Sequence, residues 1–424
     1  MSDPAPSAQD RQAAIRLKRR YAAERRFRAL GFASVLFSAL VLAFLLLTMT
    51  SNAVGGFKRT ELRFDIDLSG GVLNVDPSQL AGEGAMQALE AAGLPDVVTL
   101  AAGKAAGDAE GDMARKVVSA EMGDGAWREL GKQLIADPAL LQGKLSVSLP
   151  VSKDLAAAMR GEGSPELTAV AGALARNGML HSAFDTGFLS RSDATHAQDV
   201  GIWGALKGSM LTMLVTLVLA FPVGVLAALY LEEFAPRNRW TDIIEVSINN
   251  LAAVPSIIFG LLGLAVFLGL FPYWRSAPLI GGMTLALMTM PVIVISGRNA
   301  VKAVPPSIRD AALAVGASRM QVVFHHVLPL ALPGILTGTI IGMARALGET
   351  APLLMIGMRA FVASAPDGFT SPSSVLPVQI FLWSDEIDRG FVERTSAAII
   401  VLLLFLLVMN GIAIYLRNRF EKRW

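Results

Sequence analysis

The sequence predicts an α-helical membrane protein with a small α+β domain inserted after its first helix. The chain has 424 residues, of which 53% are hydrophobic and 17% charged, a composition too apolar for a typical soluble domain. Apolar runs of about 20 residues, the length that crosses a bilayer core, occur repeatedly along it. A long polar stretch, residues 51–200, separates the first two runs and is predicted to fold outside the bilayer.

Six apolar runs are predicted to be transmembrane helices: residues 30–50, 208–231, 250–272, 279–297, 330–358 and 396–416. Lys and Arg set their orientation, because basic loops stay in the cytoplasm. The tail of residues 1–29, the loops on its side of the membrane and the C-terminal segment carry 18 basic residues, whereas the opposite short loops carry four. Both termini are therefore expected in the cytoplasm and residues 51–200 outside it.

A second interpretation treats residues 1–53 as a cleaved signal peptide, because Ser51-Asn52-Ala53 has the small residues of a cleavage site. The apolar run of residues 30–50 is longer than the usual core of a signal peptide, and the basic segment before it is unusually long. An uncleaved first helix is the favoured prediction.

The inserted domain contains two predicted strands. Leu62, Phe64, Ile66 and Leu68 alternate with polar residues, and residues 144–151 form a second apolar alternation. Helical patterns dominate elsewhere, as in residues 84–92 and 153–177. The net charge of residues 51–200 is −7, and its scattered acids are interpreted as a solvated surface without a catalytic constellation.

The lack of cysteine and the spacing of the histidines exclude several kinds of catalytic and metal-binding site. The chain has no cysteine, so disulfides, thiolate metal sites and a cysteine nucleophile are excluded. The four histidines lack the HExxH spacing of a metal-binding helix, and no metal site is predicted.

Two charged residues lie within the predicted fifth span. Arg345 and Glu349 stand four residues apart, a spacing that places them on one helical face. An ionisable residue at membrane depth costs about 2.5–3.5 kcal/mol, which is why such residues usually line a pathway. The pair is predicted to contact a transported substrate, with Arg345 offering a planar cationic fork to an oxyanion. The alternative is a structural ion pair that holds helices together.

Three glycines share the face of that predicted span. Gly334, Gly338 and Gly342 repeat every four residues and fall with the charged pair in a stripe of about 80° on an ideal helix. Small residues at this spacing let helices approach closely, so the stripe is expected to pack against protein.

The cytoplasmic loop of residues 298–328 carries a recognisable motif. Ser307 and Asp310 are predicted to form a capping box, Gly316 to end a short helix and Ser318 to cap the next one. Asp310-Ala311-Ala312, followed by Gly316 and later by Leu328-Pro329, resembles the EAA signature of type I importer permeases of the ATP-binding-cassette class. The sequence departs from that signature at Asp310, which replaces glutamate, and at His326, which replaces isoleucine. The resemblance implies that residues 307–316 form a coupling helix that docks into an ATPase subunit.

A second resemblance narrows the family. Residues 345–354, RALGETAPLL, and residues 254–261, VPSIIFGL, are similar to segments of the PstA family of phosphate permease subunits. The likeness covers residues 201–420 and implies a permease domain of type I importer architecture in the bacterial inner membrane. It also implies a dimer of ATPase subunits, a second PstC-like permease subunit and an extracytoplasmic phosphate-binding protein as partners.

ATP and Mg²⁺ are expected in the partner ATPase, because this chain has no GxxxxGK[ST] phosphate loop. No cofactor is predicted in the chain itself, and it is not expected to be an enzyme or to bind nucleic acid. Three other functions stay open at this point: a permease for sulfate or molybdate, a transporter that needs no ATPase, and a membrane receptor that uses residues 51–200 as a sensor.

Overall fold

The structure is a computed structural model that describes residues 8–69, 71–76, 79–80, 82, 84–123, 125–197, 199–358, 361–387 and 390–420. The chain divides into two compact units, Met1–Asn52 and Ala53–Trp424. Arg359, Arg389 and the last four residues, which contribute to the predicted orientation, lie outside the described residues.

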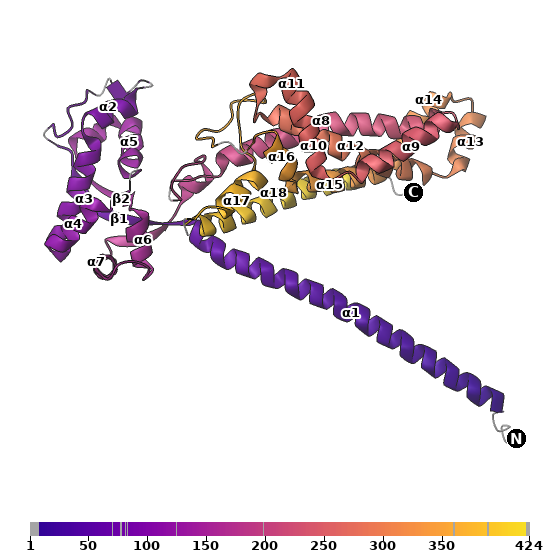
Figure 1. Ribbon diagram of the computed structural model, residues 1–424, viewed down its shortest axis with the longest axis horizontal. Helices are drawn as coiled ribbons and strands as arrows, with labels where there is room; N and C mark the ends of the chain where they lie inside the picture. The colour runs from indigo at the N-terminus through magenta and orange to yellow at the C-terminus, as the bar shows by residue number, and fades with distance from the viewer. Residues whose placement is uncertain are drawn as a thin grey trace. The chain divides into compact units, whose positions relative to one another are not determined.

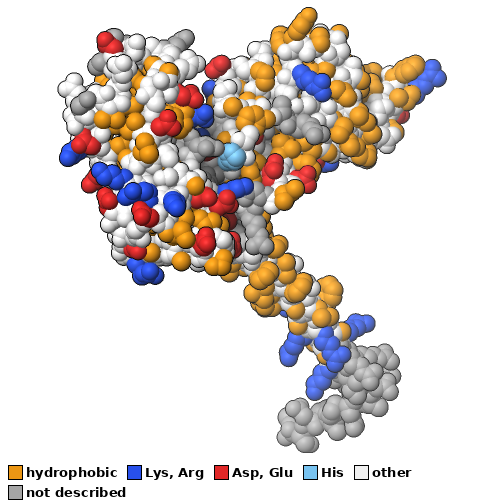
Figure 2. Space-filling view, turned by 60° about the vertical axis from the view of Figure 1, so that its left-hand side comes forward, with side chains coloured by type: hydrophobic (Ala, Val, Ile, Leu, Met, Phe, Trp, Pro, Cys, Tyr) orange, Lys and Arg blue, Asp and Glu red, His pale blue; other side chains and the backbone are white. Residues whose placement is uncertain are grey.

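Helix α1 (Ala8–Gly56) accounts for almost all of the first unit. It is 49 residues long, and its part from Arg20 to Gly56 is long and apolar enough to cross a membrane. Figure 2 shows hydrophobic side chains covering the middle of this helix and basic side chains near its N-terminal end. The helix continues without a break through residues 51–53.

The inserted domain is built on a three-stranded antiparallel sheet with the order β2-β1-β3. The central strand β1 (Lys58–Asp67) pairs with β2 (Lys144–Pro150), where Phe64 opposes Val147, and with β3 (Leu180–Phe184). The alternating residues Leu62, Phe64 and Ile66 are all buried, as the pattern predicts. Strand β3 was not predicted, because it is five residues long and has one buried position.

Helices pack on this sheet and enclose one apolar core that runs from Leu62 to Leu180. Their bounds are α2 (Ala85–Ala91), α3 (Leu94–Glu110), α4 (Asp112–Ala120), α5 (Ala126–Ala136), α6 (Lys153–Met159) and α7 (Pro165–Arg176). The domain is therefore α+β, as predicted. Figure 2 shows charged side chains of both signs scattered over its surface.

The remainder of the chain is helical (Figure 1). Besides α1, four helices are long and apolar enough to cross a membrane, and a bent pair passes the same test when counted as one span, giving up to six among the described residues. The elements are α8 (Trp203–Leu229) continued by η4 (Tyr230–Phe234), α9 (Arg239–Ala252), α10 (Ser256–Leu262), η5 (Gly263–Phe267), α11 (Leu268–Leu270), α12 (Pro278–Lys302), α13 (Pro306–Ala314), α14 (Arg319–Gln321), η7 (Val322–Val327), α15 (Leu328–Gly348), α16 (Ala351–Met355), α17 (Leu376–Ser384) and α18 (Gly390–Phe420).

Two predicted spans are broken at prolines. Residues 250–272 do not form one helix: α9 and the segment Ser256–Leu270 meet at 104°, with Pro255 between them. Residues 330–358 also do not form one helix, because α15 ends at Gly348 and Glu349 is extended, with φ −81° and ψ 118°. Proline lacks the N–H that continues a helix and its ring collides with the carbonyl four residues earlier, so Pro352 ends α15 in the turn before it. Helices α8 and α12, in contrast, continue through Pro222 and Pro291.

The three glycines of α15 pack against α12. A Cβ at Gly334 would lie 2.7 Å from Ala300 Cβ, one at Gly342 would lie 2.9 Å from Thr289 Cγ2, and one at Gly338 would overlap the Ser296 side chain. The two helices approach closely because these positions have no side chain. Arg345, one turn further along, is exposed on α15, so the charged pair does not share the glycine contact with α12.

We expect Gly338→Ala to destabilise the protein by about 1–3 kcal/mol, the usual cost of forcing extra volume into a packed interior. Ser296→Gly should restore part of that loss, because it removes the atoms with which the new methyl group collides. Gly411→Ala on α18 is the matched control, since a Cβ there meets no atom within 4 Å. Thermal unfolding in detergent measures the stability of these variants. Equal unfolding midpoints for Gly338→Ala and Gly411→Ala would contradict the close packing of Gly338 against α12.

Candidate functional site

Arg345 and Glu349 lie at the end of α15, where the helix gives way to the extended residue Glu349. Arg345 Nε is 3.5 Å from Glu349 Oε1, and the two side chains are 48% and 21% exposed. The predicted pair is therefore in contact, although Glu349 stands just beyond the helix and not on it. A single long contact between partly exposed groups contributes little to stability, typically about 0–1 kcal/mol.

The guanidinium of Arg345 keeps most of its hydrogen-bonding capacity. Within the described part of the chain, its hydrogen bond to Glu349 uses Nε alone and leaves Nη1 and Nη2 open. Two parallel N–H donors on a planar fork match the oxygens of a tetrahedral oxyanion. This geometry favours a binding role over a structural ion pair.

The predicted coupling loop forms a short helix followed by a turn and a second helix. Helix α13 spans Pro306–Ala314, and Gly316 follows it with φ +89°, the left-handed conformation expected there. Ser318 caps the next helix as predicted, in a capping box with Gln321. The predicted box of Ser307 and Asp310 is wrong: the residue before α13 is Pro305, and no side chain caps this end. Pro305 and Pro306 occupy the positions that a capping serine would need.

Helix α13 has two different faces. Ala312 is 6% exposed and belongs to an apolar cluster with Leu229, Val301 and Ile335. Asp310, Ala311 and Gly316 are exposed, and so are the apolar side chains Leu313 and Val315 at 46% and 87%. The inner face is therefore fixed to the membrane helices, and the outer face presents apolar surface of the kind a partner protein covers.

Charge placement in the loops differs from the prediction at Arg298. It was predicted to lie in the loop of residues 298–328, whereas α12 extends to Lys302 and buries Arg298 to 7% exposure. Its guanidinium binds Glu232 and Glu245 at 2.5 Å each. Arg298 is thus a charge that the helices of the membrane part bury, whereas Arg345 is exposed and Glu349 is partly exposed.

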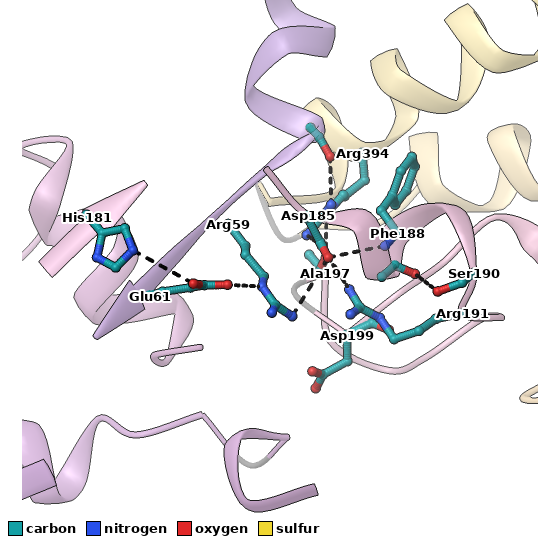
Figure 3. A network of polar contacts seen from close by, with 12 residues as sticks. Arg59, Glu61, His181, Asp185, Phe188, Ser190, Arg191, Ala197, Asp199 and Arg394 are labelled. Atoms are coloured by element: carbon teal, nitrogen blue, oxygen red, sulfur yellow. Dashed lines mark hydrogen bonds and ion pairs between the residues drawn. The ribbon is translucent and has the colours of Figure 1, made fainter. Parts of the chain in front are cut away.

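A second buried charge cluster centres on Asp185, just after β3 (Figure 3). Asp185 is fully buried, and its carboxylate accepts hydrogen bonds from Arg191 Nη2 at 2.8 and 3.0 Å and from Arg394 Nη2 at 2.8 Å. Arg59 Nη1 lies 3.8 Å away. The interpretation of all acids in residues 51–200 as solvated surface is wrong for Asp185.

Arg394 joins three separate segments. It lies on α18 and donates to Gly56 O at the end of α1 (2.6 Å) and to Ala197 O (2.8 Å), while its guanidinium stacks 5.0 Å from the centre of the Phe188 ring. Gly56 and the first turn of α18 are thereby connected to Asp185, which follows β3. The sequence offers little signal for this contact, because Arg394 and Asp185 are 209 residues apart.

The loop after β3 is also hydrogen-bonded to α17. Asp193 Oδ1 accepts a hydrogen bond from Trp383 Nε1 at 3.1 Å. Burial raises the pKa of the Asp193 carboxyl, and the Trp383 hydrogen bond opposes this effect. Since the folded state favours the protonated acid, the fold loses stability as the pH rises from the ordinary pKa of an aspartate to the raised one.

Two cavities adjoin the Asp185 cluster. Their volumes are about 760 and 660 Å³, and both are lined by basic and acidic side chains. In the first, Lys58, Arg59, Lys153, Arg160 and Arg394 face Asp154, Glu162, Glu386 and Glu393. Such a balance of charge does not select an anion.

Two family models match the chain. Residues 220–423 match the binding-protein-dependent transport system inner membrane component, and residues 14–169 match a domain of unknown function, DUF3333. The phosphate transport system permease protein PstA of Yersinia pestis is 31% identical over 214 residues, which are 50% of this chain and 71% of the relative. The PstA protein of Haemophilus influenzae is 31% identical over 50% of this chain and 73% of its own length. The chain belongs to the PstA-like permeases of this transport family.

Another curated protein and two solved structures are also similar to this PstA-like permease. The probable ABC transporter permease protein YqgI of Bacillus subtilis is 29% identical over 58% of this chain and 87% of its own length. Among solved structures, the inward-facing MetNI methionine ABC transporter covers 52% of this chain with 18% identity and a TM-score of 0.41. A bacterial ABC transporter involved in the import of alginate covers 54% with 17% identity and a TM-score of 0.40. The PstA-like permease is a multi-pass inner membrane protein and not an enzyme.

Proposed function

We propose that the chain is the permease subunit of an ATP-driven phosphate importer and forms half of its transmembrane pathway. The observation that carries the proposal is the RALGETAPLL stretch, in a chain about 30% identical to PstA proteins. It places Arg345, with two open guanidinium nitrogens, beside Glu349 at the end of α15.

The pair has complementary tasks in this proposal. Arg345 binds the anion as it passes, and Glu349 compensates the arginine when the path is empty. Binding in a pathway has to be weak enough to permit release, and a lone buried cation would hold phosphate too tightly. A PstC-like second permease subunit supplies the other half of the pathway.

Transport is coupled through the exposed outer face of α13. ATP binding closes a dimer of partner ATPase subunits, which bind ATP and Mg²⁺, and moves the coupling helix of residues 307–316 with its docking residues Asp310, Ala311 and Gly316. The membrane helices then alternate between outward and inward openings. Both termini lie in the cytoplasm, and the domain of residues 51–200 lies on the extracytoplasmic side of the membrane.

Uptake by the complete complex in proteoliposomes tests this function. We expect ATP-dependent accumulation of labelled phosphate that unlabelled phosphate suppresses and excess sulfate or molybdate does not. Suppression by sulfate or molybdate at equal concentration would assign the permease to another oxyanion. Accumulation without ATP and without the ATPase subunits would contradict the proposed coupling.

A further inference from the structure

We propose that Arg309 and Glu233, supported by Arg298, form the linkage that carries movement of the coupling helix α13 into the membrane helices α8 and α12. This inference rests on the proposed function for the direction of coupling. Its structural basis is a set of ion pairs that join the inner face of α13 to the ends of both helices.

Arg309 points away from the exposed face of α13. Its side chain is 23% exposed, and Nε and Nη2 donate to Glu233 Oε1 at 3.0 and 2.7 Å. Glu233 belongs to η4, the π-helical continuation of α8. One guanidinium therefore connects the coupling helix to the end of α8 through two hydrogen bonds to the same carboxylate oxygen.

The same guanidinium also binds the end of α12. Nη2 donates to Val301 O at 2.9 Å, and Nη1 donates to Val304 O at 2.7 Å. The last carbonyls of a helix have no partner within the helix, and a cation satisfies both their hydrogen bonding and the helix dipole. Arg309 thus holds three elements at a fixed distance, which an ordinary surface ion pair does not do.

A second set of ion pairs lies beside the first. Glu232, the neighbour of Glu233, binds Arg298 Nε at 2.5 Å and Lys302 Nζ at 3.3 Å. Arg298 also binds Glu245 of α9 through Nη2 at 2.5 Å. Successive residues of a helix point in different directions, and Glu232 and Glu233 accordingly bind different partners. Helices α8, α9, α12 and α13 are consequently joined by one charged network.

The apolar packing beneath α13 does not provide the same directional constraint. Ala312 contributes one methyl group to the cluster beneath the helix, and the partly buried Ile308 packs against the same cluster. Dispersion contacts are short-ranged and individually weak, whereas hydrogen bonds to charged groups contribute about 1.5–3 kcal/mol and depend on direction. The charged network is therefore the part of the contact that resists sliding of α13 over the membrane helices.

A distance measurement tests the linkage directly, since the chain has no cysteine and spin labels go only where cysteines are introduced. Ser307 on α13 and Leu226 on α8 are both exposed, and Ser307→Cys with Leu226→Cys reports their separation. We expect one narrow distance in the complete complex, unchanged between the nucleotide-free and vanadate-trapped states. Arg309→Gln and Glu233→Gln should broaden or shift it, and Arg309→Lys should give an intermediate result because it keeps one charged contact.

Transport stoichiometry provides the functional readout. We expect Arg309→Gln to retain the ATPase subunits, whose docking face is unchanged, and to lower phosphate moved per ATP hydrolysed at least fivefold, the lower end of typical coupling between sites. Arg237→Gln is the matched control, because Arg237 is exposed in the neighbouring loop.

The linkage is contradicted if Arg309→Gln has the same distance between the two spin labels and the same phosphate-to-ATP ratio as the protein with arginine at this position. Loss of the ATPase subunits from the variant would also contradict it. A distance that changes between the two nucleotide states of the unmodified protein would contradict it as well. Failure of the unmodified complex to take up phosphate would overturn the proposed function instead and would leave the distance result standing.

Discussion

Arg345→Gln is expected to reduce phosphate uptake about 10- to 100-fold at unchanged protein abundance. The variant removes a charge and the bidentate fork, and hydrogen bonds to charged groups contribute about 1.5–3 kcal/mol, with about 1.4 kcal/mol per factor of ten. Because Arg345 contributes one weak ion pair to the fold, the loss should fall on transport and not on stability. Initial uptake rates in proteoliposomes, normalised to permease content, measure it.

The companion variant Glu349→Gln should act differently. It leaves Arg345 without its partner, so phosphate binds more tightly and leaves more slowly. We expect the concentration for half-maximal uptake and the maximal rate to fall together. Arg237→Gln serves as the control for a lost surface charge. If Arg345→Gln and Glu349→Gln both transport at the control rate, the pair is structural and the pathway lies elsewhere.

Arg394→Ala is expected to destabilise the protein by about 3–5 kcal/mol, the usual effect of breaking a buried ion pair. Asp185 is fully buried and Arg394 is 5% exposed on its side chain, so the variant removes one of the guanidinium groups that donate to a buried carboxylate. The variant also frees the carbonyls of Gly56 and Ala197. Thermal or chemical unfolding in detergent measures the loss, together with the amount of protein that reaches the membrane.

Arg63→Ala is the matched control for this loss. Arg63 lies on β1 and is exposed, so its truncation should change stability by less than about 0.5 kcal/mol. A similar small effect for Arg394→Ala would mean that the Asp185 cluster does not hold Gly56 and the first turn of α18 to the loop after β3. A loss of stability in Arg394→Ala, with unchanged stability in Arg63→Ala, would support a structural role for the Asp185 cluster.

Composition and periodicity predict the architecture of this protein well. Long apolar helices and the alternation of β1 both follow from the burial of apolar side chains, a signal that accumulates over many residues. Pro222, Pro255, Pro291 and Pro352 all lie within predicted spans, and each is a plausible bend point in the sequence. The predicted helices break beside Pro255 and Pro352. Pro222 and Pro291 sit within unbroken helices, so proline alone does not identify a break.

Sites made by distant residues are the part that the sequence leaves open. Arg345 and Glu349 were found because they stand four residues apart in the sequence and are surrounded by apolar residues. Arg309 with Glu233, and Arg394 with Asp185, are paired by folding across 76 and 209 residues, and each looks like an ordinary loop charge in the sequence. Capping of α13 was mispredicted for a local reason, because the helix begins at Pro306 and Ser307 lies within its first turn.

Thiol labelling beside Arg345 tests the pathway claim most directly. Gly348 is exposed, and a Cβ there meets no atom within 4 Å, so Gly348→Cys places one thiol next to the charged pair in a chain without other cysteines. Gly411→Cys on α18 reports labelling away from the pathway. In the assembled complex, we predict that phosphate slows labelling of Cys at position 348 while sulfate does not, and that neither anion affects position 411. Equal labelling of position 348 with and without phosphate, in a complex that transports it, would contradict a pathway through Arg345 and Glu349.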